Sequence, residues 1–199
     1  EGRYKKQSGG HGQFGIASIR IEPLPAGSGL EFVDEVTGGA IPRQFITAVE
    51  AGVAEAMAQG GSSGYPVVDV KVAVVDGKHH SVDSSEMSFK MAGRLAFQEA
   101  LGGARCVVLE PVMAVEVTIP SECLGDVMGD LSSRRATVQG SELDRWGAQV
   151  ISAMAPEAEM LRYSIDLRSI TGGRGRFTAQ HDHYSRVPAG VAVPAPPEG

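Results

Sequence analysis

Strand-like and helix-like patterns of apolar residues follow one another along the first half of the chain, and their order restricts this half to folds of the α+β class. The strands alternate apolar and polar side chains or form short apolar runs, and the helices repeat apolar residues every three to four positions. Met87 and Met91 are expected on the buried face of the second helix. The order is β-β-β-α-β-α. The predicted strands are 3–6, 13–24, 30–36 and 66–75, with a turn at Asp76–Gly77, and the predicted helices are 42–59 and one capped by Asp83 or Ser84.

The second half has the order β-α-β-β-α-β, which is the ferredoxin-like signature. Glycines at 172 and 173 end its last helix, and Met160, Leu161 and Ile165 are expected to face the core from that helix. The predicted strands are 107–119, 137–143, 148–153 and 177–184, and the predicted helices are 120–132 and 156–170.

Two tandem α/β-sandwich domains are therefore expected, at residues 1–107 and 108–187. A Pro- and Ala-rich tail at 188–199 is expected to be disordered. The chain begins within strand-like residues rather than at Met, so we expect it to be a fragment of a longer protein. Two cysteines are too few for a disulfide framework, and no stretch approaches the roughly 20 apolar residues of a membrane span.

The formal net charge of -6 argues against a general nucleic-acid binder, so any RNA contact must come from local patches. The basic residues of 108–199 are all arginine, whose planar fork suits phosphate. Arg134 and Arg135 at a helix end, and Arg174 and Arg176 beside a Gly-rich loop, are candidates for such contacts. Favourable charge at a helix C-terminus and ordinary surface solvation are the alternatives.

Two polar segments, 5–15 and 76–86, carry glycine and histidine where strands end, as binding loops do. The glycines of the first segment could cradle an anion, but the phosphate-binding loop pattern is absent and the residues alone favour a hairpin tip. Trp146, in a turn of the second domain, is a cap or a contact.

His79, His80 and Asp83 raise the alternative of a metal-dependent hydrolase. Adjacent strand residues point in opposite directions, which makes a shared ion at His79 and His80 awkward, and no third ligand accompanies His181 and His183. We therefore expect no metal site in this chain.

Several motifs resemble elongation factor G of bacteria, in order, from about residue 5 to 188. The matching segments are KKQSGGHGQFG at 5–15, GGAIP at 38–42, GYPVVDV at 64–70, HSVDSSEM at 80–87, LEPVM at 109–113, GDVMGDL at 125–131 and LRSITGGRG at 167–175. The resemblance implies domains four and five of that translocase. The first would have the ribosomal-protein-S-five domain-two-like fold and the second the ferredoxin-like fold.

The resemblance also implies a function: promotion of tRNA–mRNA translocation on the ribosome. The tip of the first domain would contact tRNA, mRNA and the decoding site, with Gln13 and His80 as its main positions, and the candidate arginines would contact ribosomal RNA. GTP and Mg²⁺ would belong to N-terminal domains absent here, leaving this fragment without catalysis or cofactor, monomeric, cytoplasmic and away from membranes. The implied tip contacts are Ser8, Gly9, Gly10, His11, Gly12, Gln13, His79, His80 and Ser81.

Four sites depart from the family pattern: His11 stands for Arg, His79 for Tyr and Ala136 for Gly, and Arg162 replaces a Phe-Gly stretch. These departures favour a divergent, elongation-factor-G-like paralogue. A tetracycline-resistance-type ribosomal protection factor has the same layout and is the alternative. Its tip loops are usually rebuilt, whereas the loops here stay close to the translocase form.

Overall fold

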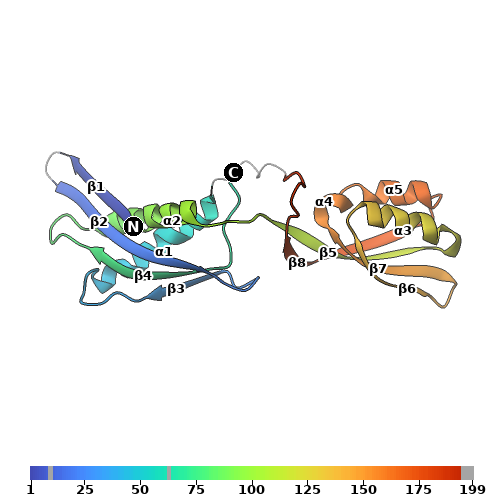
Figure 1. Cartoon of the computed structure of the whole chain (residues 1–199), viewed down its shortest axis with the longest axis horizontal. Helices are drawn as coiled ribbons and strands as arrows, with labels where there is room; N and C mark the ends of the chain where they lie inside the picture. The colour runs from blue at the N-terminus through green and yellow to red at the C-terminus, as the bar shows by residue number, and fades with distance from the viewer. Residues whose placement is uncertain (9–10, 62–63, 194–199) are drawn as a thin grey trace. The chain divides into compact units, whose positions relative to one another are not determined.

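The computed structural model describes residues 1–8, 11–61 and 64–193, which form two compact units, Glu1–Cys106 and Val107–Val193 (Figure 1). Within the described residues, no helix is both long and apolar enough to cross a membrane. Of the predicted tail, residues 188–193 contain neither helix nor strand, and 194–199 lie outside the described residues.

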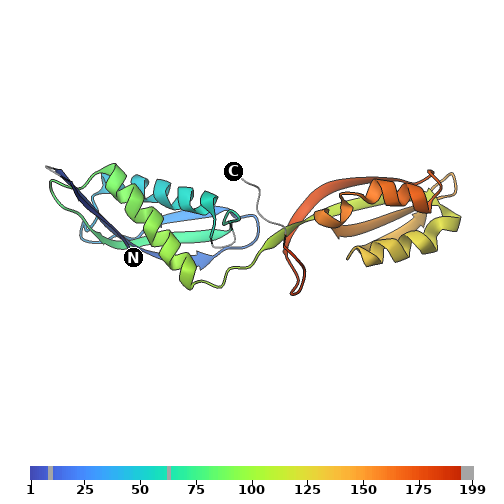
Figure 2. The ribbon, with the colours of Figure 1, turned by 90° about the horizontal axis from the view of Figure 1, so that it is seen from above.

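The first unit contains a four-stranded sheet of order β1-β2-β4-β3, with α1 and α2 packed side by side on one face (Figure 2). β3 and β4 are parallel, so the chain crosses between them through α1, and the other neighbours are antiparallel. The predicted order is confirmed. The elements are β1 Gly2–Ser8, β2 His11–Pro23, β3 Leu30–Asp34, a 3-10 turn Arg43–Phe45, α1 Ile46–Gln59, β4 Val70–Lys78 and α2 Glu86–Gly103.

Helices α1 and α2 approach each other closely because each presents a glycine to the other. A Cβ on Gly52 would lie 1.9 Å from the Lys90 carbonyl oxygen, and one on Gly93 would lie 2.5 Å from the Val49 carbonyl oxygen. Phe89, fully buried beside this contact, stacks on a second core phenylalanine. Glycine lowers the stability of a helix interior, and here the close packing of α1 against α2 offsets that cost.

The predictions for β4 and α2 need correction. β4 begins at Val70 because the preceding residue, Asp69, has a left-handed φ of 59°. The Asp69 side chain accepts a hydrogen bond from the Gly29 N–H. β4 then runs through Gly77, which pairs with Ala17 where a turn was predicted. Helix α2 is capped by Ser85, whose Oγ accepts the Ser88 N–H at 3.2 Å, and not by Asp83 or Ser84. The buried face of α2 carries Phe89 and Ala92 and leaves Met87 56% exposed, so the predicted place of Met87 in the core is wrong.

The second unit contains an antiparallel sheet of order β6-β7-β5-β8, and its ferredoxin-like connectivity is confirmed. Val117, Ile151 and Leu131 lie in the core between the sheet and the helices. The elements are β5 Leu109–Pro120, a 3-10 turn Ser121–Cys123, α3 Leu124–Ser133, β6 Thr137–Leu143, β7 Ala148–Pro156, α4 Glu157–Met160, α5 Tyr163–Ile170 and β8 Arg176–Arg186.

The helix predicted at 156–170 is interrupted, so it forms the two helices α4 and α5. The buried face runs at helical spacing through Met160, Tyr163 and Leu167, so Leu161 and Ile165 fall on the opposite side and are 78% and 59% exposed. The predicted inward orientation is therefore right for Met160 and wrong for Leu161 and Ile165.

Candidate nucleic-acid interface

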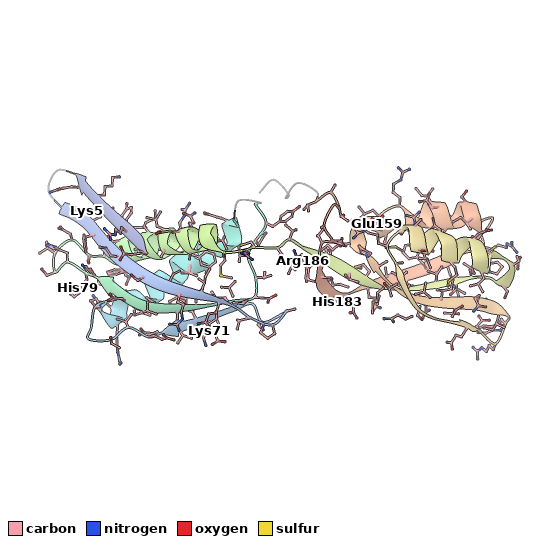
Figure 3. The ribbon with its side chains drawn as sticks, viewed as in Figure 1. Lys5, Lys71, His79, Glu159, His183 and Arg186 are labelled. Carbon is pink, nitrogen blue, oxygen red and sulfur yellow. The ribbon has the colours of Figure 1, made fainter. Side chains whose placement is uncertain are left out.

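Two polar segments meet at one end of the first unit, which we call the tip: the end of the β1–β2 hairpin and the loop 79–85 after β4. Figure 3 shows Lys5 and His79 at this end and Lys71 well away from it. Ser8 pairs with His11 across the hairpin, so residues 11–15 belong to β2 and the loop is shorter than the sequence indicates. Gly9 and Gly10 lie outside the described residues.

Asp83 and Ser84 attach the loop 79–85 to the start of β2. The Gly12 N–H donates to Asp83 Oδ1 at 3.1 Å, and the Phe14 N–H donates to the Asp83 carbonyl oxygen at 2.8 Å. Ser84 Oγ donates to the Phe14 carbonyl oxygen at 2.8 Å. These three hydrogen bonds hold two segments about 70 residues apart in sequence as one surface.

The His80 ring is held by its own loop. Its Nδ1 accepts hydrogen bonds from the Val82 N–H at 3.3 Å and the Asp83 N–H at 3.2 Å, and the ring lies edge-on to Phe14. An accepting nitrogen carries no proton, so this bonding network assigns the proton of the neutral ring to Nε2. Because the side chain is 54% exposed, the tip offers an Nε2–H donor held in one orientation.

The other sequence-predicted tip residues are placed around this loop. The Tyr4 hydroxyl donates to Gln13 Oε1 at 2.9 Å, which leaves the Gln13 amide nitrogen as a donor. His79 is exposed, and its Nδ1 lies 3.2 Å from the Ala40 carbonyl oxygen, which ties the loop to the turn at 37–40. Ser81 is exposed. The tip thus brings Gly12, Gln13 and the histidines of the loop together.

Glycine permits the close contact between β2 and the elements behind it. A Cβ on Gly12 would lie 3.0 Å from the Asp83 carboxylate, and one on Gly15 would lie 2.9 Å from the Ser88 carbonyl oxygen. A side chain at either position would therefore push the loop 79–85 or the start of α2 outward.

The tip is locally basic although the chain is acidic. Lys5, Lys6 and Lys78 are exposed, and none of them forms an ion pair within the described part of the chain. The Asp83 carboxylate accepts the Gly12 N–H and forms no ion pair with a lysine among the described residues. A local excess of cationic donors attracts phosphate even on an acidic protein.

Arg134 and Arg135 lie at the end of α3 and are largely occupied within the second unit. Arg134 pairs with Asp130 at 2.9 Å and Asp166 at 2.7 Å, while Arg135 pairs with Glu110 at 2.7 Å and Glu159 at 3.0 Å. Hydrogen bonds to Asp130 raise the pKa of Arg134, and hydrogen bonds to Glu110 raise that of Arg135. The geometry gives both guanidinium groups a structural task, and their contact with ribosomal RNA stays a prediction.

Arg174 and Arg176 are far more accessible. Arg174 Nη1 donates to Glu122 Oε1 at 2.8 Å in a pair whose side chains are 58% and 65% exposed. Arg176 is exposed and makes no ion pair among the described residues. Both can therefore reach an outside partner, and their predicted RNA contact remains a prediction.

No group of three or more His, Cys, Asp or Glu side chains in the described residues is arranged to hold a metal ion. Sequence reasoning missed the roles of Asp83, Ser84 and Tyr4 at the tip, because it assigned the first two to a helix cap. The run Asp83-Ser84-Ser85 did contain a usable signal. All three residues are of types that cap helices, and a helix needs only one cap, so the other two are available for hydrogen bonds elsewhere.

Comparison with known proteins assigns both units. The family model described as elongation factor G, domain IV, matches residues 1–105, and the model described as elongation factor G C-terminus matches 107–193. A crystal structure of a Thermus thermophilus protein is 41% identical, with a TM-score of 0.86 over 94% of this chain. The match spans 28% of that protein. The two models match nearly the whole length of this chain, in the order of the domains they describe. The chain therefore belongs to the elongation factor G family.

Proposed function

We propose that this chain is the ribosome-engaging C-terminal part of a translational GTPase, and that its tip contacts the tRNA–mRNA pair in the decoding site during translocation. The observation that carries this proposal is the tip itself: the hairpin and the loop 79–85 form one surface, held by Asp83 and Ser84, next to lysines that form no ion pair with residues 1–8, 11–61 or 64–193. Because this surface is already ordered, binding a partner costs the protein little conformational entropy.

The chemistry of the tip suits a paired RNA helix. Such a helix presents ribose hydroxyls and phosphates along a shallow minor groove, which proteins recognise mainly by shape. His80 Nε2–H, the Gln13 amide and the lysine ammonium groups are donors, and none of them discriminates between base pairs. A factor that serves every codon needs this kind of contact.

In this proposal GTP and Mg²⁺ are bound by domains outside this chain, and the chain carries no catalytic step of its own. The partners are the ribosome, with its RNA, and the bound tRNA and mRNA, and the protein works as a monomer in the cytoplasm. The histidines at positions 11 and 79, where the family has Arg and Tyr, make it a divergent paralogue that translocates slowly or conditionally.

The test is a substitution at the tip of the full-length parent protein. His80→Ala should slow single-round translocation while ribosome-stimulated GTP hydrolysis stays near normal, because the tip acts after the GTPase is engaged. His183→Ala, which removes an exposed histidine from the second unit, is the matched control. Equal loss of both activities, or no loss of either, would contradict a tip-specific role. Normal translocation with lost release of tetracycline would favour a ribosomal protection factor.

A further inference from the structure

The turn between β6 and β7 carries the single tryptophan of the chain, Trp146, and this side chain is 74% exposed. An indole ring usually contributes to stability by burying a large apolar area. In water it makes no such contribution, and tryptophan is enriched at interfaces, where its apolar ring contacts a partner.

The turn holds this ring on a defined backbone. Asp144 Oδ1 accepts hydrogen bonds from the Trp146 N–H and the Ala148 N–H, both at 2.8 Å. Ser121 Oγ donates to the Gly147 carbonyl oxygen at 2.9 Å, which ties the turn to the end of β5. The ring therefore projects from a fixed support, so a partner that stacks on it loses little backbone freedom in the protein.

One arginine lies over the ring, and two more line a hollow beside it. The Arg145 guanidinium lies 3.9 Å from the centroid of the Trp146 ring, within cation–π distance. An open hollow of about 670 Å³ adjoins the ring, and its lining includes Arg174 and Arg176 together with the acidic residues Asp144 and Glu122. Asp144 accepts the N–H groups of its own turn, and Glu122 pairs with Arg174. Neither Arg145 nor Arg176 has a carboxylate partner among the described residues, and the exposed pair of Arg174 with Glu122 contributes little to stability, so it exchanges readily.

We propose that this hollow binds an unpaired nucleotide of an RNA loop, with its base stacked on Trp146 and its phosphates paired with Arg174 and Arg176. A nucleotide joins a flat ring to an anion, and the hollow offers a stacking surface beside guanidinium groups. An acidic peptide would satisfy the arginines but leave the ring without a matching partner. The inference rests on the proposed function only in taking the ribosome as the source of the RNA.

Because Trp146 is the sole tryptophan, intrinsic fluorescence of the 199-residue chain reports on this hollow directly. The chain is titrated with a decamer of adenylate RNA, with an abasic ribose-phosphate decamer of equal length, and with a glutamate decamer. We expect saturable quenching by the adenylate decamer and at least about tenfold weaker binding of the abasic one, as for loss of base stacking. Added salt should weaken both nucleic-acid ligands.

Variants separate the contacts. Arg176→Ala should weaken binding of the adenylate decamer severalfold, whereas Arg162→Ala, which removes an exposed arginine outside the hollow, should not. Trp146→Ala, followed by the anisotropy of a labelled decamer, should weaken it about fivefold or more. His80→Ala should leave the tryptophan response unchanged, so failure of the tip function and failure of this site are distinguishable.

Three results would overturn the proposal. Equal affinity for the adenylate and abasic decamers would exclude stacking on Trp146. Tighter binding of the glutamate decamer would point to a protein partner. Equal effects of Arg176→Ala and Arg162→Ala would reduce the interaction to general charge.

Discussion

Replacing Asp83 by alanine tests whether the two segments of the tip form one unit. The change removes the acceptor of the Gly12 N–H and keeps the backbone bond from Phe14 and the Ser84 Oγ bond. Only one of the three hydrogen bonds between loop and hairpin is therefore lost.

The size of the effect follows from that bond. A hydrogen bond to an ionised acceptor contributes about 1.5–3 kcal/mol. The Asp83 side chain is 32% exposed, so water replaces part of the interaction. We expect a loss of about 1–2 kcal/mol in the free energy that holds the loop closed, or roughly 5- to 30-fold in its opening equilibrium.

Amide hydrogen exchange measured by NMR gives the direct readout. Exchange of the Gly12 amide should accelerate by that factor in Asp83→Ala and by less in Asp83→Asn, which keeps a neutral acceptor. Asp76→Ala is the control, because Asp76 is an exposed carboxylate on β4 in the same sheet. If the Gly12 amide exchanges within about twofold of the unchanged chain in Asp83→Ala, the hydrogen bond does not hold the tip and the reasoning fails.

Three further predictions concern packing, pH and the family departures. Gly52→Ala should lower the free energy of unfolding by about 3 kcal/mol, because the new Cβ would meet the backbone of α2. Gly102→Ala, whose Cβ would lie in open space, should raise the free energy of unfolding by about 0.5–1 kcal/mol. Urea denaturation of both variants measures these changes. Burial raises the pKa of Tyr163, so this residue's contribution to stability is present below about pH 10 and falls as the pH rises further. Tyr163→Phe removes a buried hydroxyl that has no hydrogen-bond partner among the described residues, so this variant should be at least as stable and should lose the alkaline dependence in pH-resolved denaturation. In the full-length parent, joint His11→Arg and His79→Tyr substitutions should speed single-round translocation, and an unchanged rate already equal to that of a housekeeping factor would contradict the paralogue assignment.

Much of the fold was predictable because periodicity reports which side of an element is buried. The alternation in β2 and the helical repeat in α1 gave both the element types and their order. The errors arose where a neighbour in space decided. Leu161 is apolar and four residues before Ile165, yet the face packed on the sheet is the one that carries Met160, Tyr163 and Leu167, and Leu161 lies in solvent. Met87 is exposed because α2 buries the face that carries Phe89, Ala92 and Ala96.

The candidate site was predictable only as a set of residues. Glycine, histidine and lysine in two segments indicated a binding surface, and their resemblance to a known factor named its expected target. Nothing in the spacing shows that Asp83 accepts from Gly12 or that His80 Nδ1 accepts from its own loop. The same limit applies to Arg134 and Arg135, whose carboxylate partners come from β5, α4 and α5 as well as α3.

The sequence by itself determined the two α+β units, their strand and helix order and the family, because local periodicity and contiguous motifs are written along the chain. Only the tertiary structure decided which polar groups are occupied and which remain available: the guanidinium groups at the end of α3 are engaged, while the lysines of the tip and Trp146 face solvent. The physical reason is that hydrogen bonds and ion pairs form between side chains brought together by packing, and their availability depends on neighbours distant in sequence.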